Sequence, residues 1–351
     1  MKYLITGAGG LIGSEAVKFF SKKGLVWGID NNMRSEFFGS QGDVTPVISS
    51  LSEIEGYTHF WSDITKEDQM NDIFRKIMPD VVIHCAAQPS HDKAASIPIL
   101  DFDVNARGTI ILLESFRKYC NKDAVFLHMS TNKVYGDGPN NVPIVELPNR
   151  WEYDANCKDS LYKKGVPENF PIDSCLHSLF GASKVSADVI AQEYGRYFGL
   201  NVGIFRGGCL TGPQHAGVEL HGFLSYIVRC AVRNIPYTIF GYKGKQVRDQ
   251  IHSLDVISAF EHFIISPRKG EVYNIGGGYE NSLSVIEVIN KIRENHKYSL
   301  SYCLDETNRI GDHICYYSDL SKLKSHFPSW KITKSTDEII DEIVYQNKKE
   351  S

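Results

Sequence analysis

The stretch Leu4-Ile-Thr-Gly7-Ala-Gly9-Gly10-Leu-Ile-Gly13 decides the fold, because it sets glycines between a short apolar run and an amphipathic segment. A strand that turns directly into a helix needs glycine where the turn is tight, where the backbone approaches a pyrophosphate, and where helix and sheet pack closely. The unpaired N–H groups at the start of such a helix then face the phosphates. The stretch therefore predicts a dinucleotide site rather than a plain glycine-rich turn. Its expected ligands are Gly7, Gly10, Leu11, Ile12 and Gly13.

A second expected strand, residues 26–30, ends in an acid about 20 residues after the glycines, as dinucleotide-binding units require. Asp30 can bind the free hydroxyls of the adenosine ribose and would repel a 2′-phosphate. NAD is therefore favoured as the cofactor. Asn31 lies beside this acid, and Arg34 nearby keeps NADP open as the alternative.

Apolar β-branched runs alternate with amphipathic segments along the first 135 residues, which predicts a parallel sheet covered by helices on both faces. The fold class is therefore α/β, a Rossmann-like doubly wound sheet with a smaller C-terminal substrate-binding lobe. Strands are expected at 2–6, 26–30, 80–85, 124–130, 201–206, 236–240 and 247–251. Helices are expected at 11–22, 104–119, 177–198, 221–233, 254–265 and 282–295.

The pattern breaks between residues 137 and 175 into proline, asparagine, aspartate and lysine with isolated aromatics. This segment is longer than an ordinary connection, so a functional insertion is expected, with a disordered linker as the alternative. Residues 1–175 would form the NAD-binding domain with this insertion. Residues 176–351 would combine the remaining sheet elements with the C-terminal lobe.

Composition excludes several other classes of protein. The 351 residues carry a net charge of −4, so no global basic field is available to attract nucleic acid. The eight cysteines lack the spacing of a zinc site or a disulfide framework, and no apolar run approaches a membrane span, so a cytoplasmic protein is expected. His215, Glu219 and His221 have metal-like spacing without a closing motif, and no metal is predicted.

Several further segments, in order along the chain, resemble the extended short-chain dehydrogenase/reductases that modify sugar nucleotides. The resemblance implies that Asp63 and Ile64 lie beside the adenine, that Ala86, Ala87 and Gln88 lie along the cofactor, and that Asn105 is the family's helix asparagine. It also implies a substrate side at Arg206, Gln246, Arg248 and Arg309, with Arg248 and Arg309 on a diphosphate. Glu146, Arg150, Trp151, His177 and the segment 130–137 resemble the subgroup of CDP-paratose (CDP-tyvelose) 2-epimerases.

The same resemblance implies a catalytic set, from which one member is missing. Thr131 matches the family's catalytic serine or threonine, and Lys184 matches the lysine of its Tyr-x-x-x-Lys pair, which also binds the cofactor. Phe180 stands at the tyrosine position, and a phenyl ring has no ionisable proton. Phe180 could line the substrate, but another group must take the proton. Tyr135, His177, Cys175 and Lys133 are nearest in sequence, with Tyr135 the leading candidate.

Asn132 and Lys133 bear on the reaction class, because the family's 4,6-dehydratases resemble Ser-Thr-Asp-Glu at this strand. An amide and an ammonium cannot do the acid–base work of two carboxylates, so water elimination is disfavoured. Asn132 and Lys133 are instead expected to contact substrate. The sequence thus favours NAD-dependent epimerisation of a nucleoside-diphosphate sugar, with C2 as the carbon. Another redox step such as 4-epimerisation, or a catalytically silent binding protein, is the alternative. Family likeness implies a homodimer.

Overall fold

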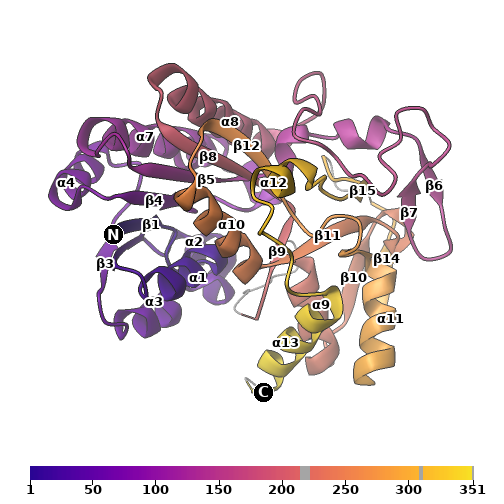
Figure 1. The fold of residues 1–351 in the computed structure, drawn as a ribbon. Coiled ribbons are helices and arrows are strands. Elements are labelled where there is room, and N and C mark those ends of the chain that lie inside the picture. The colour runs from indigo at the N-terminus through magenta and orange to yellow at the C-terminus, as the bar shows by residue number, and fades with distance from the viewer. Residues whose placement is uncertain (214–221, 308–310, 350–351) are drawn as a thin grey trace. The chain divides into compact units, whose positions relative to one another are not determined.

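A seven-stranded sheet in the order β12-β8-β5-β4-β1-β2-β3 forms the centre of the structure (Figure 1). The computed structural model describes residues 1–213, 222–307 and 311–349. Strand β1 pairs in parallel with both β2 and β4, so the strand order reverses between β1 and β4. Ligands of open α/β sheets bind outside the carboxyl ends of the strands at this switch point. The strands are β1 Lys2–Thr6, β2 Leu25–Asp30, β3 Tyr57–Trp61, β4 Val81–His84, β5 Val125–Thr131, β8 Asn201–Gly207 and β12 Lys269–Ile275.

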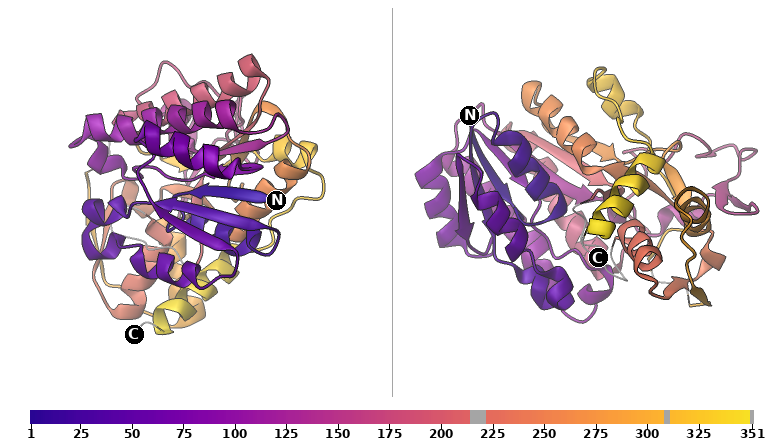
Figure 2. Two further views of the ribbon diagram at one scale, coloured as in Figure 1. Left: turned by 90° about the vertical axis from the view of Figure 1, so that its left-hand side faces the viewer. Right: turned by 90° about the horizontal axis from the view of Figure 1, so that it is seen from below.

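Helices cover both faces of this sheet, as the alternating sequence pattern predicts (Figures 1 and 2). In Figure 1, α4, α7 and α8 lie above the sheet, and α1, α3 and α10 lie below it. The α/β doubly wound fold is therefore confirmed. The helices are α1 Leu11–Phe20, α2 Met33–Phe38, α3 Thr45–Ser52, α4 Glu67–Ile77, α5 His91–Ala94, α6 Pro98–Phe102, α7 Gly108–Tyr119, α8 Ser178–Phe198 and α10 Ser253–Ile265.

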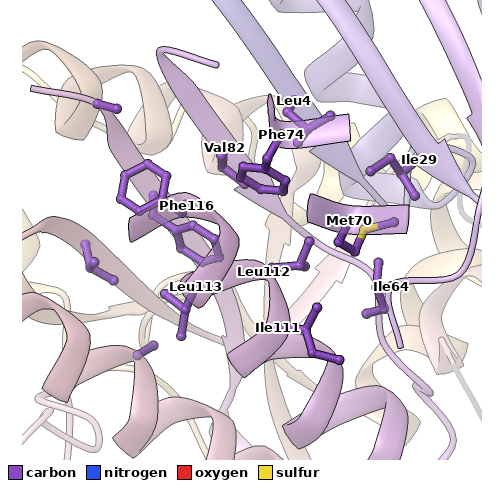
Figure 3. Close-up of a cluster of buried hydrophobic side chains, with 14 of the residues drawn as sticks. Leu4, Ile29, Ile64, Met70, Phe74, Val82, Ile111, Leu112, Leu113 and Phe116 are labelled. Atoms are coloured by element: carbon purple, nitrogen blue, oxygen red, sulfur yellow. The ribbon is translucent and has the colours of Figure 1, made fainter. Parts of the chain in front are cut away.

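The core on the α4 and α7 side is built from large apolar side chains that these helices turn toward the sheet (Figure 3). Phe74, Leu112 and Phe116 lie together there with Leu4 and Val82 of the strands, and none is more than 2% exposed. Burial of each such side chain contributes roughly 1.5–3 kcal/mol. This packing fixes the strand ends on which the site residues stand.

The chain divides into two compact units. The first comprises residues 1–134, 179–206 and 256–273, and the second comprises 135–178, 207–255 and 274–351. The segment 137–175 therefore falls in the second unit, where it contains a short antiparallel hairpin. The elements of the second unit are β6 Ile144–Glu146, β7 Trp151–Tyr153, β9 Cys209–Thr211, α9 Phe223–Arg233, β10 Tyr237–Phe240, β11 Val247–His252, β13 Ser282–Ser284, α11 Val285–His296, β14 Tyr302–Asp305, β15 Cys315–Tyr316, α12 Ser321–His326 and α13 Thr336–Lys349.

One expected helix, 104–119, begins differently in the structure. Helical turns start at Pro98 in α6 and pass through a wide π-turn at Asp103–Arg107 before α7 begins at Gly108. Single π-turns inside helices are frequent at functional sites. Within the described ranges, no helix is long and apolar enough to cross a membrane.

Candidate cofactor and catalytic site

The glycine loop between β1 and α1 is a backbone cradle that side chains would fill. Gly7 has φ +70°, and a Cβ there would lie 2.7 Å from the backbone nitrogen of Ala86. A Cβ on Gly13 would lie 2.0 Å from the carbonyl oxygen of Gly7. Gly10 is the N-cap of α1 and provides no side-chain cap for the first-turn N–H groups of Leu11, Ile12 and Gly13. The loop therefore fits the pyrophosphate of a dinucleotide at a helix N-terminus.

The acid expected to select NAD is held firmly at the end of β2. One carboxylate oxygen of Asp30 accepts from the Gly9 backbone N–H at 2.9 Å, and the other accepts from that of Asn32 at 2.9 Å. A carboxylate has about four acceptor positions, so ribose hydroxyls can still bind. The Asn31 side chain accepts from the Met33 backbone N–H, and the guanidinium of Arg34 lies over the Phe38 ring.

Asp63 and Ile64 follow β3, as the resemblance implies, but they differ in accessibility. One carboxylate oxygen of Asp63 accepts from both the backbone N–H and the hydroxyl of Thr65. The Ile64 side chain belongs to the core cluster of Figure 3. Only the backbone of Ile64 could therefore contact an adenine.

The strand end at Ala86–Gln88 is tied to a buried polar network that includes two predicted cofactor ligands, Gln88 and Asn105. The Gln88 side chain donates to Asp101 at 2.8 Å and accepts from the backbone N–H of Ser90. Asn105 accepts from the Gln88 backbone N–H at 2.9 Å and donates to Asp101 and Ser183. Gln88 and Asn105 are at most 1% exposed and bind one another and Asp101, so they support the strand end, and their contact with the cofactor stays a prediction.

Asp101 connects this network to helix α8. The Ser183 hydroxyl contacts an Asp101 carboxylate oxygen at 2.5 Å and the Phe180 carbonyl oxygen at 3.0 Å. Burial raises the pKa of Asp101, whereas the hydrogen bonds from Ser183 and Gln88 oppose this shift. The backbone of α8 at its catalytic end is thus fixed relative to the end of β4.

Thr131 and Lys184 occupy the positions expected of the catalytic strand and helix. Thr131 is the last residue of β5, and its hydroxyl accepts from the Lys133 backbone N–H and contacts the Asn132 side chain. The Lys184 ammonium donates to the Met129 carbonyl oxygen at 3.0 Å. Burial lowers the pKa of Lys184 to about 8, against the opposing charge of Asp188.

Phe180 is buried, and its ring lies edge-on to the imidazole of His91 with ring centroids 6.4 Å apart. Sequence reasoning missed His91, because 89 positions separate the two residues and only the fold brings them together. The available signal was the Ser90-His91-Asp92 string directly after the cofactor-binding strand end.

Arg206 has a structural partner in this arrangement, which argues against its predicted place on the substrate side. Its guanidinium donates to both carboxylate oxygens of Asp188, at 3.0 and 2.8 Å. The side chains of this ion pair are 4% and 0% exposed. Release of this guanidinium to a diphosphate is disfavoured, because leaving Asp188 unpaired in the interior would be strongly unfavourable.

Three of the candidate bases belong to the second unit. The fully buried Tyr135 hydroxyl donates to the Asn274 side chain at 2.7 Å, which argues against Tyr135 as the proton acceptor. The thiol of Cys175 lies 3.6 Å from His177 and 3.4 Å from the Tyr135 carbonyl oxygen. Burial raises the pKa of Cys175, so the group is a protonated thiol at neutral pH and cannot accept the substrate proton.

On the predicted substrate side, the guanidinium of Arg248 pairs with Asp312 at 2.7 Å. The structure thus joins the strand motif and the Gly311-Asp312 motif. Burial opposes the charge on Arg248, but Asp312 holds its pKa above the ordinary value. Gln246 donates to the Phe240 carbonyl oxygen. Arg309, His215, Glu219 and His221 lie outside the described residues.

The residues that resemble the 2-epimerase subgroup anchor the β6–β7 hairpin within the second unit. Glu146 pairs with Lys243 and Lys245, and Arg150 pairs with Glu152 and Glu287. The Trp151 indole N–H points to a carbonyl oxygen at 3.4 Å. These contacts give the three residues a structural role in the hairpin.

Comparisons with known proteins agree with this geometry. Residues 3–156 and 161–276 match the model of the NAD dependent epimerase/dehydratase family. The chain is 31% identical to CDP-paratose 2-epimerase of Salmonella typhi, over 92% of each chain. It is 28% identical to dTDP-glucose 4,6-dehydratase of Salmonella typhimurium, over 94% of this chain and 88% of that one. UDP-glucose 4-epimerase of Thermotoga maritima has the same fold, with a TM-score of 0.78 at 24% identity over 100% and 99% of the two chains.

Proposed function

Because this chain belongs to the NAD-dependent epimerase/dehydratase family, we propose that it epimerises a nucleoside-diphosphate sugar at C2 through a transient keto sugar. The proposed substrate class is a CDP-activated deoxyhexose, in line with the similarity to a CDP-paratose 2-epimerase. NAD is the cofactor of the family, and the glycine cradle and Asp30 fit it.

The observation that carries this proposal is the Asn132–Lys133 pair directly after β5. Elimination of water from a sugar needs a positioned acid and base at the reacting carbons. Neither the amide nor the ammonium can replace a pair of carboxylates. The dehydratase reaction of the second relative is therefore disfavoured for this chain, and a redox epimerisation is left as the reaction that the family likeness supports.

The chain's own residues divide the work as follows. NAD, when bound, accepts a hydride from the sugar and returns it. The N–H groups of the α1 N-terminus would hold its pyrophosphate, Asp30 its adenosine ribose, and Lys184 its nicotinamide ribose. Thr131 would hydrogen-bond the sugar hydroxyl that is oxidised.

The nucleotide part of the substrate is assigned to the second unit. Arg248, with Arg309, would bind the diphosphate, since guanidinium groups match phosphate oxygens in two-point contacts. Gln246 would contact the same ligand. Asn132 and Lys133 would contact the sugar, and the ring of Phe180 would form an apolar wall beside it.

Phe180 favours one further candidate, a catalytically silent protein that binds NAD or sugar nucleotides. A site that lacks its usual base could retain both ligands without reaction. Epimerisation at C4 is a second redox alternative within the same family.

Two measurements on the purified protein decide between these functions. The protein is denatured and the released nicotinamide is assayed, and the intact protein is incubated with CDP-, UDP-, GDP- and dTDP-sugars while NMR follows the sugar C–H signals. Inversion at C2 of a CDP-sugar without uptake of solvent deuterium supports the proposal. Inversion at C4, or deuterium at the inverted carbon, would refute C2 redox epimerisation. Binding without any conversion would favour the silent protein.

We further propose that the chain acts as a homodimer through helix α8. Its residues Leu179, Ala182 and Val189 are exposed and lie within a sector of about 80° around the helix axis. An exposed apolar stripe of this kind is typical of an interface between subunits. Light scattering should report a dimer for the native chain and a monomer for Val189→Arg, and a monomeric native chain would refute the proposal.

A further inference from the structure

His91 lies against the ring of Phe180, the residue at the position where the family resemblance implies a tyrosine. We infer that His91 is the catalytic base of this protein, with its Nε2 atom accepting the proton of the substrate hydroxyl that is oxidised. This inference rests on the proposed redox function. It also answers the difficulty that Phe180 raises, because the base comes from another element of the same unit.

The Nε2 atom of His91 is buried and has no hydrogen-bond partner among the described residues. The side chain as a whole is only 15% exposed. Buried polar atoms in native proteins are nearly always paired, and an unpaired one costs about 1–3 kcal/mol. A buried nitrogen beside Phe180 without a protein partner is therefore explained if its partner is a ligand hydroxyl.

The relative position of His91 and Phe180 is fixed by the buried network around Asp101. Ser90, the N-cap of α5, accepts from the Lys93 backbone N–H, and its own backbone N–H donates to Gln88. Gln88 and Ser183 both bind Asp101, and Ser183 also contacts the Phe180 carbonyl oxygen. The two ring-bearing segments are thus tied to a single carboxylate, as a catalytic geometry requires.

The charge around the imidazole suits a proton acceptor. A carboxylate oxygen of Asp92 lies 3.8 Å from Nδ1 of His91, too far for a hydrogen bond but close enough to stabilise a positive charge on the ring. A carboxylate on the Nδ1 side of a histidine stabilises the imidazolium that forms when Nε2 takes a proton. The Lys184 amine, one helical turn after Phe180, already donates to the Met129 carbonyl oxygen.

The proposed step balances as follows. The sugar C–H bond breaks with hydride going to NAD⁺, the oxidant of the proposed function. The hydroxyl O–H bond breaks at the same carbon, its proton goes to His91 Nε2, and its electron pair becomes the second bond of the carbonyl group. After the sugar presents its other face, hydride returns to carbon and His91 returns the proton to oxygen.

The test uses the NAD-loaded native chain and CDP-paratose as the probe, with NMR to follow inversion at C2. His91→Gln keeps a hydrogen-bonding side chain but removes the base. It should lower kcat by about 10²–10⁴-fold, the usual contribution of a general base. The dissociation constant for CDP-paratose, measured by calorimetry, should change by less than about threefold, since an amide can still bond the hydroxyl.

Restoring the missing phenol gives the decisive variant. His91→Gln/Phe180→Tyr should recover at least about tenfold of the rate that His91→Gln loses, because a second base then occupies the site. A merely structural histidine would not be rescued in this way. His262→Gln is the matched control, since His262 bonds the Ser258 carbonyl oxygen within α10 and has no place in the site. Its rate should stay within about twofold of the native value.

A readout independent of turnover completes the design. The ¹⁵N signal of His91 Nε2 in the native chain should shift when CDP-paratose binds, and the signal of His262 should not. His91→Asn serves as a second variant if His91→Gln does not fold. An unchanged Nε2 signal with bound probe, full activity in either variant, or absence of rescue in the folded double variant would overturn the assignment. If the native chain binds CDP-paratose with a shifted Nε2 signal but converts no sugar, the proposed function fails while the contact to His91 stands.

Discussion

Replacing Arg206 by methionine should destabilise the first unit without changing ligand affinity. The guanidinium of Arg206 makes two hydrogen bonds to Asp188, and the Asp188 carboxylate also accepts from the hydroxyl of Ser130 at 2.6 Å and from the amide of Gln192 at 2.7 Å. Methionine fills a similar volume but leaves that carboxylate buried with only two neutral donors. The charge of Asp188 is then no longer compensated.

The expected magnitude follows from this burial. Removal of one partner from a buried ion pair costs about 3–5 kcal/mol, because the remaining charge stays out of water. The free energy of unfolding should fall by that amount in urea denaturation followed by far-ultraviolet circular dichroism. Asp188→Asn/Arg206→Met should be more stable than Arg206→Met alone, since the double variant no longer buries a carboxylate that has lost its guanidinium partner.

Ligand binding provides the contrast with the role expected from sequence. The folded Arg206→Met variant should retain its NAD and bind the nucleotide sugar with a dissociation constant within about threefold of the native value, since no ligand contact is lost. A loss of less than about 1 kcal/mol in stability, together with a large loss of sugar-nucleotide affinity, would refute the reasoning and restore Arg206 to the substrate side.

Three further predictions test other parts of the site. Asp30→Ala should weaken NAD binding and relax discrimination against NADP, as measured by titrations that follow protein fluorescence. Tighter binding of NADP than of NAD by the native chain would refute the assignment of Asp30. The pKa of Lys184 is lowered from 10.5 to about 8, so the unfolded chain binds more protons than the folded chain between these values. The free energy of unfolding of the native chain, relative to that of Lys184→Met, should therefore rise across that window by up to about 1.4 kcal/mol per pH unit. Urea denaturation of both proteins at several pH values measures this difference. Arg248→Ala should weaken the binding free energy of the nucleotide sugar, measured by calorimetry, by about 1.5–3 kcal/mol and leave bound NAD unchanged. Equal loss of both ligands would make Arg248 a structural residue.

The sequence predicts features that depend on neighbours along the chain. The bounds of β1 and the first residue of α1 agree with the structure, because glycines between an apolar run and an amphipathic segment permit few conformations. Strand β3 was not among the expected strands. It lies at the edge of the sheet and leaves Trp61 59% exposed, so its residues lack the apolar pattern of an interior strand.

The partners that side chains find on distant segments could not be predicted from the sequence. The motif places Arg206 correctly at the end of a strand, but nothing in the motif reveals that Asp188 of α8 lies opposite it. Asn105 and Gln88 were likewise assigned to the cofactor, although each finds its partners inside the protein. The Ser90-His91-Asp92 string marks His91 in the sequence, but the contact between His91 and Phe180 depends on how α5 and α8 are placed by the whole first unit.

The hydrogen bond from Ser183 reaches the carbonyl oxygen of residue 180, not its ring. The helix is therefore indifferent to whether tyrosine or phenylalanine stands there, and a single-nucleotide change in the codon exchanges the two. Exchange of the two residues therefore leaves this hydrogen bond in place, and the hydroxyl of a tyrosine at this buried position would need a partner of its own. A base on another element can thus become indispensable while the backbone around residue 180 stays unchanged.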